Sequence, residues 1–307
     1  MEQLLTTKLY IPPLRSDLVP RPHLYDRLNQ GSNRKLTLVS APAGFGKSTL
    51  VSGWLAESGI RAAWLSLDQG DNDPVRFWMY LIAAIQTIHQ EIGVEALQVV
   101  SAPQLRSTEL VVISLINDIS QLAQDLIVVL DDYHVIEAGQ VHAGLSYLLE
   151  HQPPNLHLIL ITRVDPSISL ARLRAHGRLV EIRAGDLQFS SNEAAVLFNE
   201  VLSLKLKPEQ VEALNRRAEG WIVGLNLAAL SLKGQPASER IIARFTGSHQ
   251  FILDYLTEEV LEALPDAHRQ FLLWTSILDR FCAALCVAVT GNPTSQQVLD
   301  ELRNGNL

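Results

Sequence analysis

The sequence predicts an α/β fold, with a doubly wound and mostly parallel β-sheet, followed by a region made of helices alone. Short apolar runs alternate with amphipathic stretches in the first part of the chain, which is typical of βαβ units. A glycine-containing loop joins the first apolar run to a helix. From Ser190 onward no strand-like run occurs, so we expect the helical region to follow the sheet.

The first apolar run belongs to the stretch 36–49, LTLVSAPAGFGKST, which is typical of a strand, a phosphate loop and the start of a helix. Uncovered backbone N–H groups at a helix N-terminus attract the oxygens of a nucleoside triphosphate. Gly44 and Gly46 allow the backbone to curl around them. The pattern G-x-x-x-x-G-K-[ST] places Lys47 at the β- and γ-phosphates and the hydroxyl of Ser48 at Mg²⁺.

The loop departs from this pattern at one position, where Ala41 replaces the first glycine. Alanine is the smallest replacement and Pro42 stiffens the turn, so we interpret the loop as intact. A strand-to-helix turn without a ligand is the alternative, but it gives no reason for a lysine at the mouth of the loop. The expected nucleotide contacts are Ala43, Gly44, Phe45, Gly46, Lys47, Ser48 and Thr49.

Two carboxylates follow a second apolar run. The sequence LIVVL at 126–130 predicts a strand that is covered on both faces, and Asp131 and Asp132 come directly after it. In phosphate-loop enzymes the first such carboxylate binds Mg²⁺ through water and the next acidic group can position the attacking water. We therefore expect Asp131 to be a metal ligand and Asp132 to be catalytic. The alternative for Asp132 is a cap of the following turn.

A guanidinium follows the predicted strand 156–162. Arg163 can bind γ-phosphate oxygens with its two parallel N–H groups and so distinguish a triphosphate from a diphosphate. We expect it to bind nucleotide and to act in catalysis together with Lys47 and Asp132. The alternative is a surface arginine.

The N-terminal 20 residues carry three prolines, which favour an extended arm over a helix. A short helix is expected at 23–29. An arm in this place can lie along the nucleotide base, so Val19, Pro20 and Arg21 are candidates for adenine contacts. Packing of the arm on the edge of the sheet is an equally good interpretation.

Other elements follow from periodicity and capping. Strands are expected at 62–67 and 178–183, and helices from Lys47 to Gly59, at 74–90 and at 109–122, with a long connection at 91–108. The acidic turn 68–74 lacks the glutamate of a Ca²⁺ loop, so Asp73 is interpreted as an N-cap before Pro74. Arg76 has two interpretations, a phosphate contact or a solvated side chain.

The sequence from Ser190 onward predicts helices and no strands. Ser190 or Ser191 with Glu193 resembles a capping box, and segment 220–225 joins two helices. Cys282 and Cys286 share one helical face and are expected to pack in a core rather than bind metal. The expected helices are 191–203, 208–218, 221–233, 250–263, 266–276, 282–289 and 295–303.

Composition narrows the class of protein. The chain has 307 residues, of which 47% are hydrophobic and 19% charged, as in globular proteins. Its net charge of -8 argues against direct nucleic-acid binding, which needs a basic face. The first residues do not look like a signal peptide, and no apolar run approaches the ~20 residues of a membrane span. A cytoplasmic protein without membrane contacts is expected.

Several motifs in order resemble those of the MalT-type regulators, which are large ATP-dependent LuxR-family bacterial activators within the signal-transduction ATPases with numerous domains (STAND). The segments are TKLYIPPLRSDLVPRPHLYDRL, SAPAGFGKST, WLSLDQGDNDPVRFWMYLIAAI, LIVVLDDYH, LILITRVDP, GWIVGLNLAALSL and FILDYLTEEVL. The resemblance implies a P-loop NTPase domain at 1–185, a small helical domain at 186–235 and a partial winged-helix domain at 236–307. The Gly-Trp segment stands where related ATPases have a Gly-x-Pro turn.

The resemblance also implies a function. The chain is expected to be an ATP- and ADP-binding switch with Mg²⁺, whose slow hydrolysis resets a self-associating state that ATP and a small-molecule inducer promote. The inducer and DNA would act through sensor and helix-turn-helix domains that are absent from these 307 residues. The alternatives are a STAND ATPase of a defence or scaffold protein, and a metabolic phosphotransferase.

Overall fold

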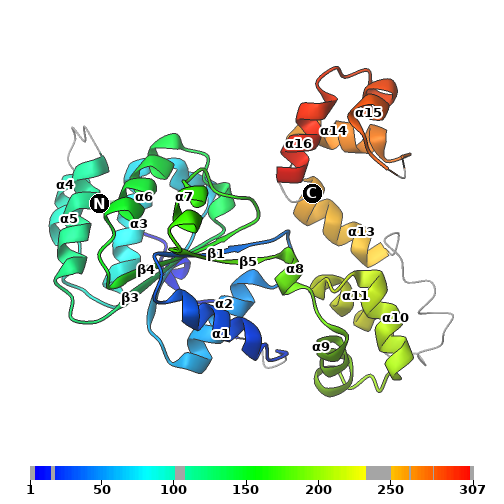
Figure 1. Ribbon diagram of the computed structural model, residues 1–307, viewed down its shortest axis with the longest axis horizontal. Helices are drawn as coiled ribbons and strands as arrows, with labels where there is room; N and C mark the ends of the chain where they lie inside the picture. The colour runs from blue at the N-terminus through cyan, green and yellow to red at the C-terminus, as the bar shows by residue number, and fades with distance from the viewer. Residues whose placement is uncertain are drawn as a thin grey trace. The chain divides into compact units, whose positions relative to one another are not determined.

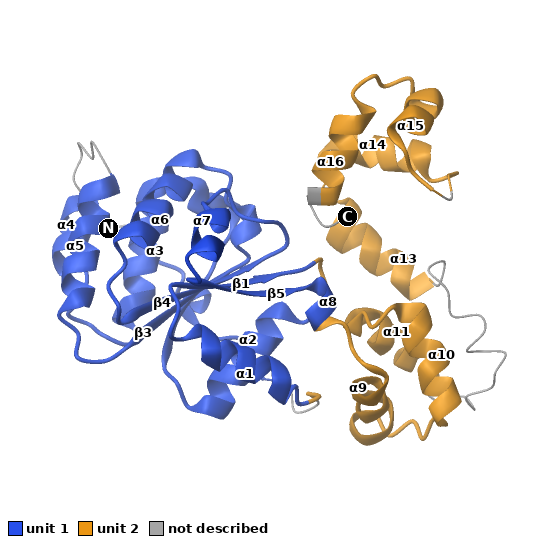
Figure 2. Ribbon diagram, viewed as in Figure 1, with its two compact units in different colours: residues 1–16, 20–41, 46–186 blue, residues 17–19, 42–45, 187–307 orange. Residues whose placement is uncertain are grey.

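The computed structural model describes residues 4–14, 18–100, 108–232, 250–262, 264–278 and 280–304. The chain divides into two compact units (Figure 2). The first unit comprises 1–16, 20–41 and 46–186, and the second comprises 17–19, 42–45 and 187–307. Segment 42–45 of the glycine loop therefore belongs by its contacts to the second unit.

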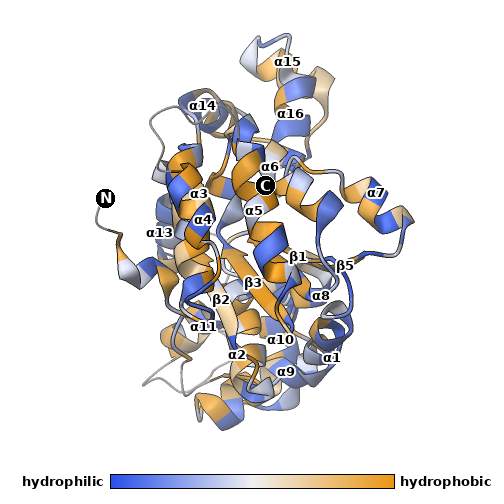
Figure 3. Cartoon of the chain, turned by 90° about the vertical axis from the view of Figure 1, so that its left-hand side faces the viewer, coloured by the Kyte–Doolittle hydropathy of each residue, from blue (hydrophilic) through white to orange (hydrophobic). Residues whose placement is uncertain are grey.

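A five-stranded sheet forms the centre of the first unit, and its strand order is β2-β3-β4-β1-β5. Every neighbouring pair is parallel, as the sequence predicts. Parallel strands covered on both faces read as continuous apolar runs, and β3 is correspondingly hydrophobic (Figure 3). The strands are β1 (Leu36–Ser40), β2 (Ala62–Ser66), β3 (Leu126–Asp131), β4 (Leu156–Thr162) and β5 (Leu179–Arg183).

Helices cover both faces of this sheet (Figure 1). One face carries α1 (Pro22–Gly31) and α2 (Lys47–Ser58). The other carries α3 (Pro74–Gln86), α4 (Val94–Val100), α5 (Thr108–Ser120), α6 (Gly139–His151) and α7 (Leu170–Ala175). This arrangement places the ends of β1, β3 and β4 at one edge of the sheet, which is where ligands bind in doubly wound folds.

Four helices on this face differ from the sequence expectations. The predicted connection 91–108 contains α4, and α3 ends at Gln86 rather than near 90. No expected helix corresponds to α6 or α7. Helix α6 contains Gly139 and Gly144, which weaken a helical pattern, but a Cβ on Gly144 would lie 2.7 Å from Trp78 Cζ2. Glycine is needed at 144 because α6 packs closely against Trp78.

The N-terminal arm is not simply extended, because Thr6–Leu9 form a short 3₁₀ helix. Its Lys8 is buried and pairs with the carboxylates of Asp71 and Asp68. The backbone N–H of Leu5 donates to Tyr80 Oη at 3.0 Å. The charge on Lys8 therefore anchors the described part of the arm to the turn after β2.

The same turn decides the roles of Arg76 and Asp73. Arg76 Nε donates to Asp71 Oδ1 at 3.1 Å, and its Nη2 donates to Asp68, so the partly exposed side chain contacts carboxylates, whereas a phosphate contact stays a prediction. Asp73 Oδ1 accepts from the backbone N–H groups of Val75 and Arg76 at 2.8 and 3.0 Å. The predicted N-cap is thus confirmed.

The second unit contains helices and, in its described residues, no strand. Its first core packs α9 (Ser191–Ala195), the π-helical continuation Val196–Val201, α10 (Pro208–Ala218), α11 (Ile222–Leu232) and α13 (Gln250–Leu256) around residues that include Phe189, Phe198, Leu214 and Leu225. Ser190 and Glu193 form the predicted capping box. The expected regular helix 191–203 is instead part α-helix and part π-helix.

A second, smaller core joins α14 (Asp266–Thr275), α15 (Ala283–Thr290) and α16 (Ser295–Asn304) around Phe271, Cys286 and Leu302. The expectation for Cys282 is wrong, since its side chain is exposed. Cys282 is the N-cap of α15 and has extended backbone angles, so the helical spacing does not place it on the buried face. Among the described residues, every helix is too short or too polar to cross a membrane.

Candidate functional site

The loop between β1 and α2 has the backbone conformation of a phosphate cradle. Gly44 and Gly46 have φ values of 76° and 74°, which only glycine adopts without strain. Helix α2 begins at Lys47, and its N-cap residue Gly46 has no side chain with which to cap it. The backbone N–H groups of its first turn have no carbonyl partner within the helix and suit an anion there.

Within the second unit, Trp221 and Val223 form hydrogen bonds to the backbone of the glycine loop. Trp221 Nε1–H donates to the carbonyl of Ala43 at 3.1 Å, and the backbone N–H of Val223 donates to the carbonyl of Gly44 at 3.4 Å. The Trp221 ring meets the ring of Tyr255 at an edge, with centroids 5.5 Å apart. Sequence reasoning marked the Gly-Trp segment only as a joint between helices, and its place in the family motif was the one available signal.

Two predicted magnesium ligands meet in the first unit. Ser48 Oγ, in the first turn of α2, donates to Asp131 Oδ1, at the end of β3, at 2.9 Å. The backbone N–H of Asp132 donates to the same oxygen at 3.0 Å. Burial first, and then the charge of Asp132, raise the pKa of Asp131 to about 7, although the hydrogen bonds and Lys47 lower it. A cation would hold this buried carboxyl in its ionised form, so the donor set fits Mg²⁺.

Lys47 lies in the same cluster. Its side chain is buried, and burial followed by the charge of Arg163 lowers its pKa to about 8, while Asp132 and Asp131 act in the opposite direction. The structure therefore brings together the four charged residues that the sequence selected from three separate segments. A buried ammonium and a guanidinium in one place favour binding of a multiply charged anion.

Asp132 differs from Asp131 in conformation and exposure. Its φ is 57°, and its side chain is 49% exposed, against 4% for Asp131. The turn Tyr133–Val135 begins after Asp132, but the carboxylate of Asp132 makes no capping hydrogen bond to it. The side chain of Asp132 is thus directed to something other than the turn.

His134 is a neighbour that sequence reasoning missed. Its Nδ1 lies 3.9 Å from Asp132 Oδ1. Burial first, and then the charges of Arg163 and Lys47, lower its pKa to about 4, so the imidazole is neutral at pH 7. The sequence DDYH was noted for its acids alone, and the histidine two positions later gave no separate signal.

Two of the candidates for adenine contacts pack within the protein. Val19 packs against the first core of the second unit. Arg21 is buried in the first unit, and its Nη2 donates to the carbonyl of Asp186 at 3.2 Å. The adenine contacts of Val19 and Arg21 stay a prediction.

Mg²⁺ would depend on oxygens from outside the protein. Among the described residues, no group of three or more His, Cys, Asp or Glu side chains could hold a metal ion. Mg²⁺ is usually bound by one or two carboxylates together with substrate phosphates and water. Ser48 and Asp131 are therefore a sufficient protein contribution to a Mg²⁺-nucleotide site.

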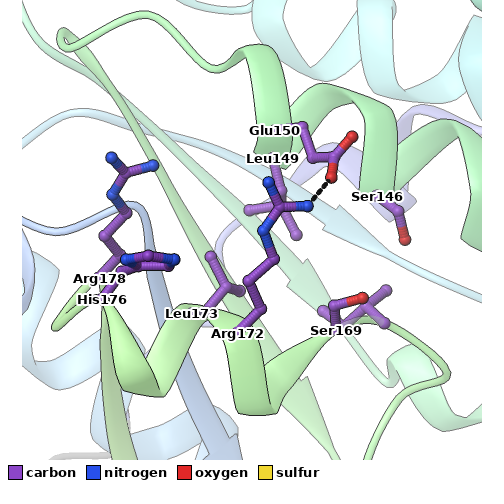
Figure 4. A pocket seen from close by; sticks show the side chains of 9 residues that line it. Ser146, Leu149, Glu150, Ser169, Arg172, Leu173, His176 and Arg178 are labelled. Atoms are coloured by element: carbon purple, nitrogen blue, oxygen red, sulfur yellow. Dashed lines mark hydrogen bonds and ion pairs between the residues drawn. The ribbon is translucent and has the colours of Figure 1, made fainter.

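A separate pocket lies between α6 and α7, near the beginning of β5 (Figure 4). None of the predicted site residues lines it. Arg172 pairs with Glu150 across the pocket. Its wall is formed by Ser146, Leu149, Glu150, Ile168, Ser169, Arg172, Leu173, His176 and Arg178.

Comparison with known proteins finds relatives of this chain. The chain is 35% identical over 309 aligned residues to the HTH-type transcriptional regulator MalT of Yersinia pestis, an alignment that covers 99% of the chain and 34% of that protein. The family model of the MalT winged helix domain matches residues 257–307. The chain is a relative of the MalT-type regulators. The resemblance seen in the sequence is therefore confirmed.

The chain is also similar to a protein kinase. The chain is 33% identical over 293 residues to the serine/threonine-protein kinase PknK of Mycobacterium tuberculosis, covering 94% of the chain and 26% of the kinase. The chain thus spans about one third or less of the curated relatives that it matches.

Solved structures agree on the fold of this chain. A STAND protein with a tetratricopeptide repeat sensor from Pyrococcus horikoshii has a TM-score of 0.56 at 18% identity, covering 96% of the chain and 40% of that protein. The Orc1 protein of Aeropyrum pernix has a TM-score of 0.50 at 14% identity, covering 96% and 85%. The fold is an α/β P-loop NTPase followed by helical and partial winged-helix parts.

Proposed function

We propose that this chain is the ATP- and ADP-binding switch module of a MalT-like bacterial transcription activator. The observation that carries the proposal is the hydrogen bond from Ser48 Oγ to Asp131 Oδ1, which joins the two expected Mg²⁺ ligands across 83 positions of sequence. The relation to MalT-type regulators supports a regulatory module rather than a metabolic enzyme.

Each residue of the cluster has a role in this proposal. The backbone from Ala43 to Thr49 surrounds the phosphates, and Lys47 binds the β- and γ-phosphates. Ser48 and Asp131 hold Mg²⁺, which stabilises the charge on the phosphates. Asp132 positions the attacking water, and Arg163 contacts the γ-phosphate. Val19 and Arg21 contact the adenine.

The energy of switching limits what the γ-phosphate can do alone. Moving a two-state equilibrium from about 1:99 to 99:1 needs ~5.5 kcal/mol of differential binding. A charge-assisted hydrogen bond from Arg163 contributes ~1.5 to 3 kcal/mol. The remainder has to come from an inducer and from contacts between copies of the protein, so ATP and inducer together promote self-association and slow hydrolysis resets it.

The role of Arg163 has a direct test. Arg163→Ala should weaken ATP binding about 10- to 100-fold, which corresponds to the loss of ~1.5 to 3 kcal/mol, and should leave ADP binding within about twofold. Calorimetry with both nucleotides measures this difference. An equal loss for ATP and ADP would show that Arg163 does not recognise the γ-phosphate.

The proposal also covers the domains of the module and its place in a larger protein. The domains are expected at 1–185, 186–235 and 236–307, in the cytoplasm. The inducer and DNA are recognised by other domains of the protein. A regulator and a protein kinase both match this region, which supports a shared switch whose output is produced elsewhere.

Mass analysis of nucleotide released from the purified chain is the most informative experiment. The switch should release ADP or ATP, and isolated wild-type chain should bind Mg²⁺-ATP in calorimetry. A chain that releases no nucleotide and binds none in calorimetry would contradict the proposal.

A second experiment separates the competing classes. With radiolabelled ATP and a panel of small phosphate acceptors, a switch should label no acceptor, whereas a phosphotransferase would label at least one. Tight nucleotide retention without any hydrolysis would instead favour a binding-only ATPase of a defence or scaffold protein.

A further inference from the structure

The turn that follows β3 fixes the position of His134. Tyr133 Oη and His142 Nδ1 are 2.9 Å apart and hydrogen-bonded. Asn72 Nδ2 donates to the carbonyl of Val135 at 2.8 Å. Its Oδ1 accepts from the backbone N–H groups of residues 137 and 138. The residues on both sides of His134 are thus tied to other elements, so the backbone that carries His134 is held in place.

The imidazole of His134 presents an unused polar atom to the cluster of charged residues. Its side chain is 18% exposed, and its Nδ1 is buried. Nδ1 has no hydrogen-bond partner within the described part of the chain. Buried polar atoms are nearly always satisfied, and the exceptions in a native protein usually mark a functional site. Asp132 Oδ1 lies 3.9 Å from His134 Nδ1.

A water molecule shared by these two acceptors requires Asp132 to move outward, because they lie only 3.9 Å apart and Nδ1 is closed to solvent in this structure. Two acceptors that share a water lie roughly 4 to 5 Å apart, because each hydrogen bond is about 2.8 Å long. The 49% exposed side chain of Asp132 has room to adjust. Arg163 and Lys47 act electrostatically on His134 and favour its neutral form, which is the form in which Nδ1 can accept a hydrogen bond.

We propose that His134 is a further catalytic residue, which holds the attacking water together with Asp132 through Nδ1. This inference rests on the proposed function. One hydrogen of the water is donated to Asp132 and the other to His134, so an oxygen lone pair is directed at the γ-phosphorus. With both hydrogens fixed, the water has one productive orientation rather than several.

The reaction balances as follows. The water oxygen bonds to the γ-phosphorus, and the bond from that phosphorus to the β,γ-bridging oxygen breaks, with its electron pair leaving on ADP. The proton on the Asp132 side passes to the Asp132 carboxylate and then to phosphate. The other hydrogen stays on the new phosphate, and His134 remains neutral throughout.

Two substitutions of His134 distinguish a role of the Nδ1 atom from a role of the imidazole ring as a whole. In His134→Asn a polar atom remains where Nδ1 lies, whereas the longer side chain of His134→Gln places its polar end near the position of Nε2. Both replacements are polar and uncharged, so folding should be retained in both. His176→Gln is the matched control, because His176 is exposed and lines the separate pocket.

The readout is single-turnover hydrolysis of labelled ATP by the full chain, with calorimetric ATP affinity alongside. Single turnovers report the chemical step without product release. His134→Gln should lower the rate about 10- to 100-fold with ATP affinity within about twofold, a loss typical of one positioned group. His134→Asn should stay within about fivefold of wild type, and His176→Gln should match it.

Three outcomes would overturn the inference. The first is a His134→Gln rate within about twofold of wild type, and the second is an equal loss in both His134 variants. The third is wild-type chain that binds ATP but does not hydrolyse it, which leaves the nucleotide site intact. Failure of the proposed function is distinct, because wild-type chain would then bind no nucleotide in calorimetry.

Discussion

Two clusters of charged side chains in the first unit differ in whether their surroundings favour the neutral or the charged forms. Near α2, burial pushes Lys47 and Asp131 toward their neutral forms, with pKa values of about 8 and about 7. The second cluster, the β5 cluster, contains Glu181 of β5 and Arg174. The hydrogen bond from Arg174 is the largest of the effects that lower the pKa of Glu181 to about 2. The β5 cluster satisfies its own charges, whereas the cluster at α2 is poised for charges brought by a ligand.

The largest effect that tests this comparison is expected at Lys47. Lys47→Ala should abolish Mg²⁺-ATP binding, with affinity lower by at least about 100-fold, because a buried cation facing two phosphates is lost. The fold should be retained, since removal of a buried charge relieves its desolvation. Calorimetry measures the affinity, and unchanged affinity would remove the proposed site.

The next effect is expected on the chemical step. Asp132→Asn should bind Mg²⁺-ATP normally but lose hydrolysis by about 100-fold or more, because an amide is a poor proton acceptor. Release of labelled phosphate measures the rate. Normal turnover in this variant would exclude Asp132 from catalysis.

The perturbed pKa values predict a pH optimum for binding. Asp131 must be ionised to bind Mg²⁺, so affinity should fall about tenfold for each pH unit below about 7. Lys47 must be protonated to bind phosphate, so affinity should also fall above about pH 8. Calorimetry from pH 5.5 to 9 tests both limbs. A flat profile would mean that the two groups do not titrate with binding.

The smallest effect is expected in the β5 cluster. Glu181→Gln should lower the free energy of unfolding at pH 7 by about 1 kcal/mol or less, because Arg174 is half exposed. Glu181 has a lowered pKa, so its contribution is present above about 4.5 and is lost as the pH falls toward about 2. Urea denaturation at several pH values measures this. Nucleotide affinity should not change, and a change would place the β5 cluster in the site.

The sheet and the loop were predictable because their signals are local. Strands such as β3 are buried on both faces and therefore read as apolar runs. The glycines and Lys47 fall in one short segment. Asp131 and Arg163 could be found because Asp131 ends β3 and Arg163 directly follows β4, and the ends of both strands lie at the ligand edge of the sheet.

Features that depend on contacts between distant segments were missed. Helix α6 carries glycine where Trp78 packs against it, and no pattern within α6 indicates that contact. Trp221 contacts a carbonyl 178 positions away, and His134 is distinguished by its buried surroundings rather than by its sequence. These properties belong to the packed chain and are absent from any single window of sequence.

The ion pair of Lys8 has a practical consequence for dissecting the molecule. Asp71 is fully buried and receives hydrogen bonds from Lys8, from Arg76 and from the backbone of Asp68. A recombinant fragment that started at Pro22 would keep that carboxylate but discard its ammonium partner, at a cost of about 3 to 5 kcal/mol. Fragments meant for crystallisation or assays should therefore retain the first ten residues, even though the sheet begins only at Leu36.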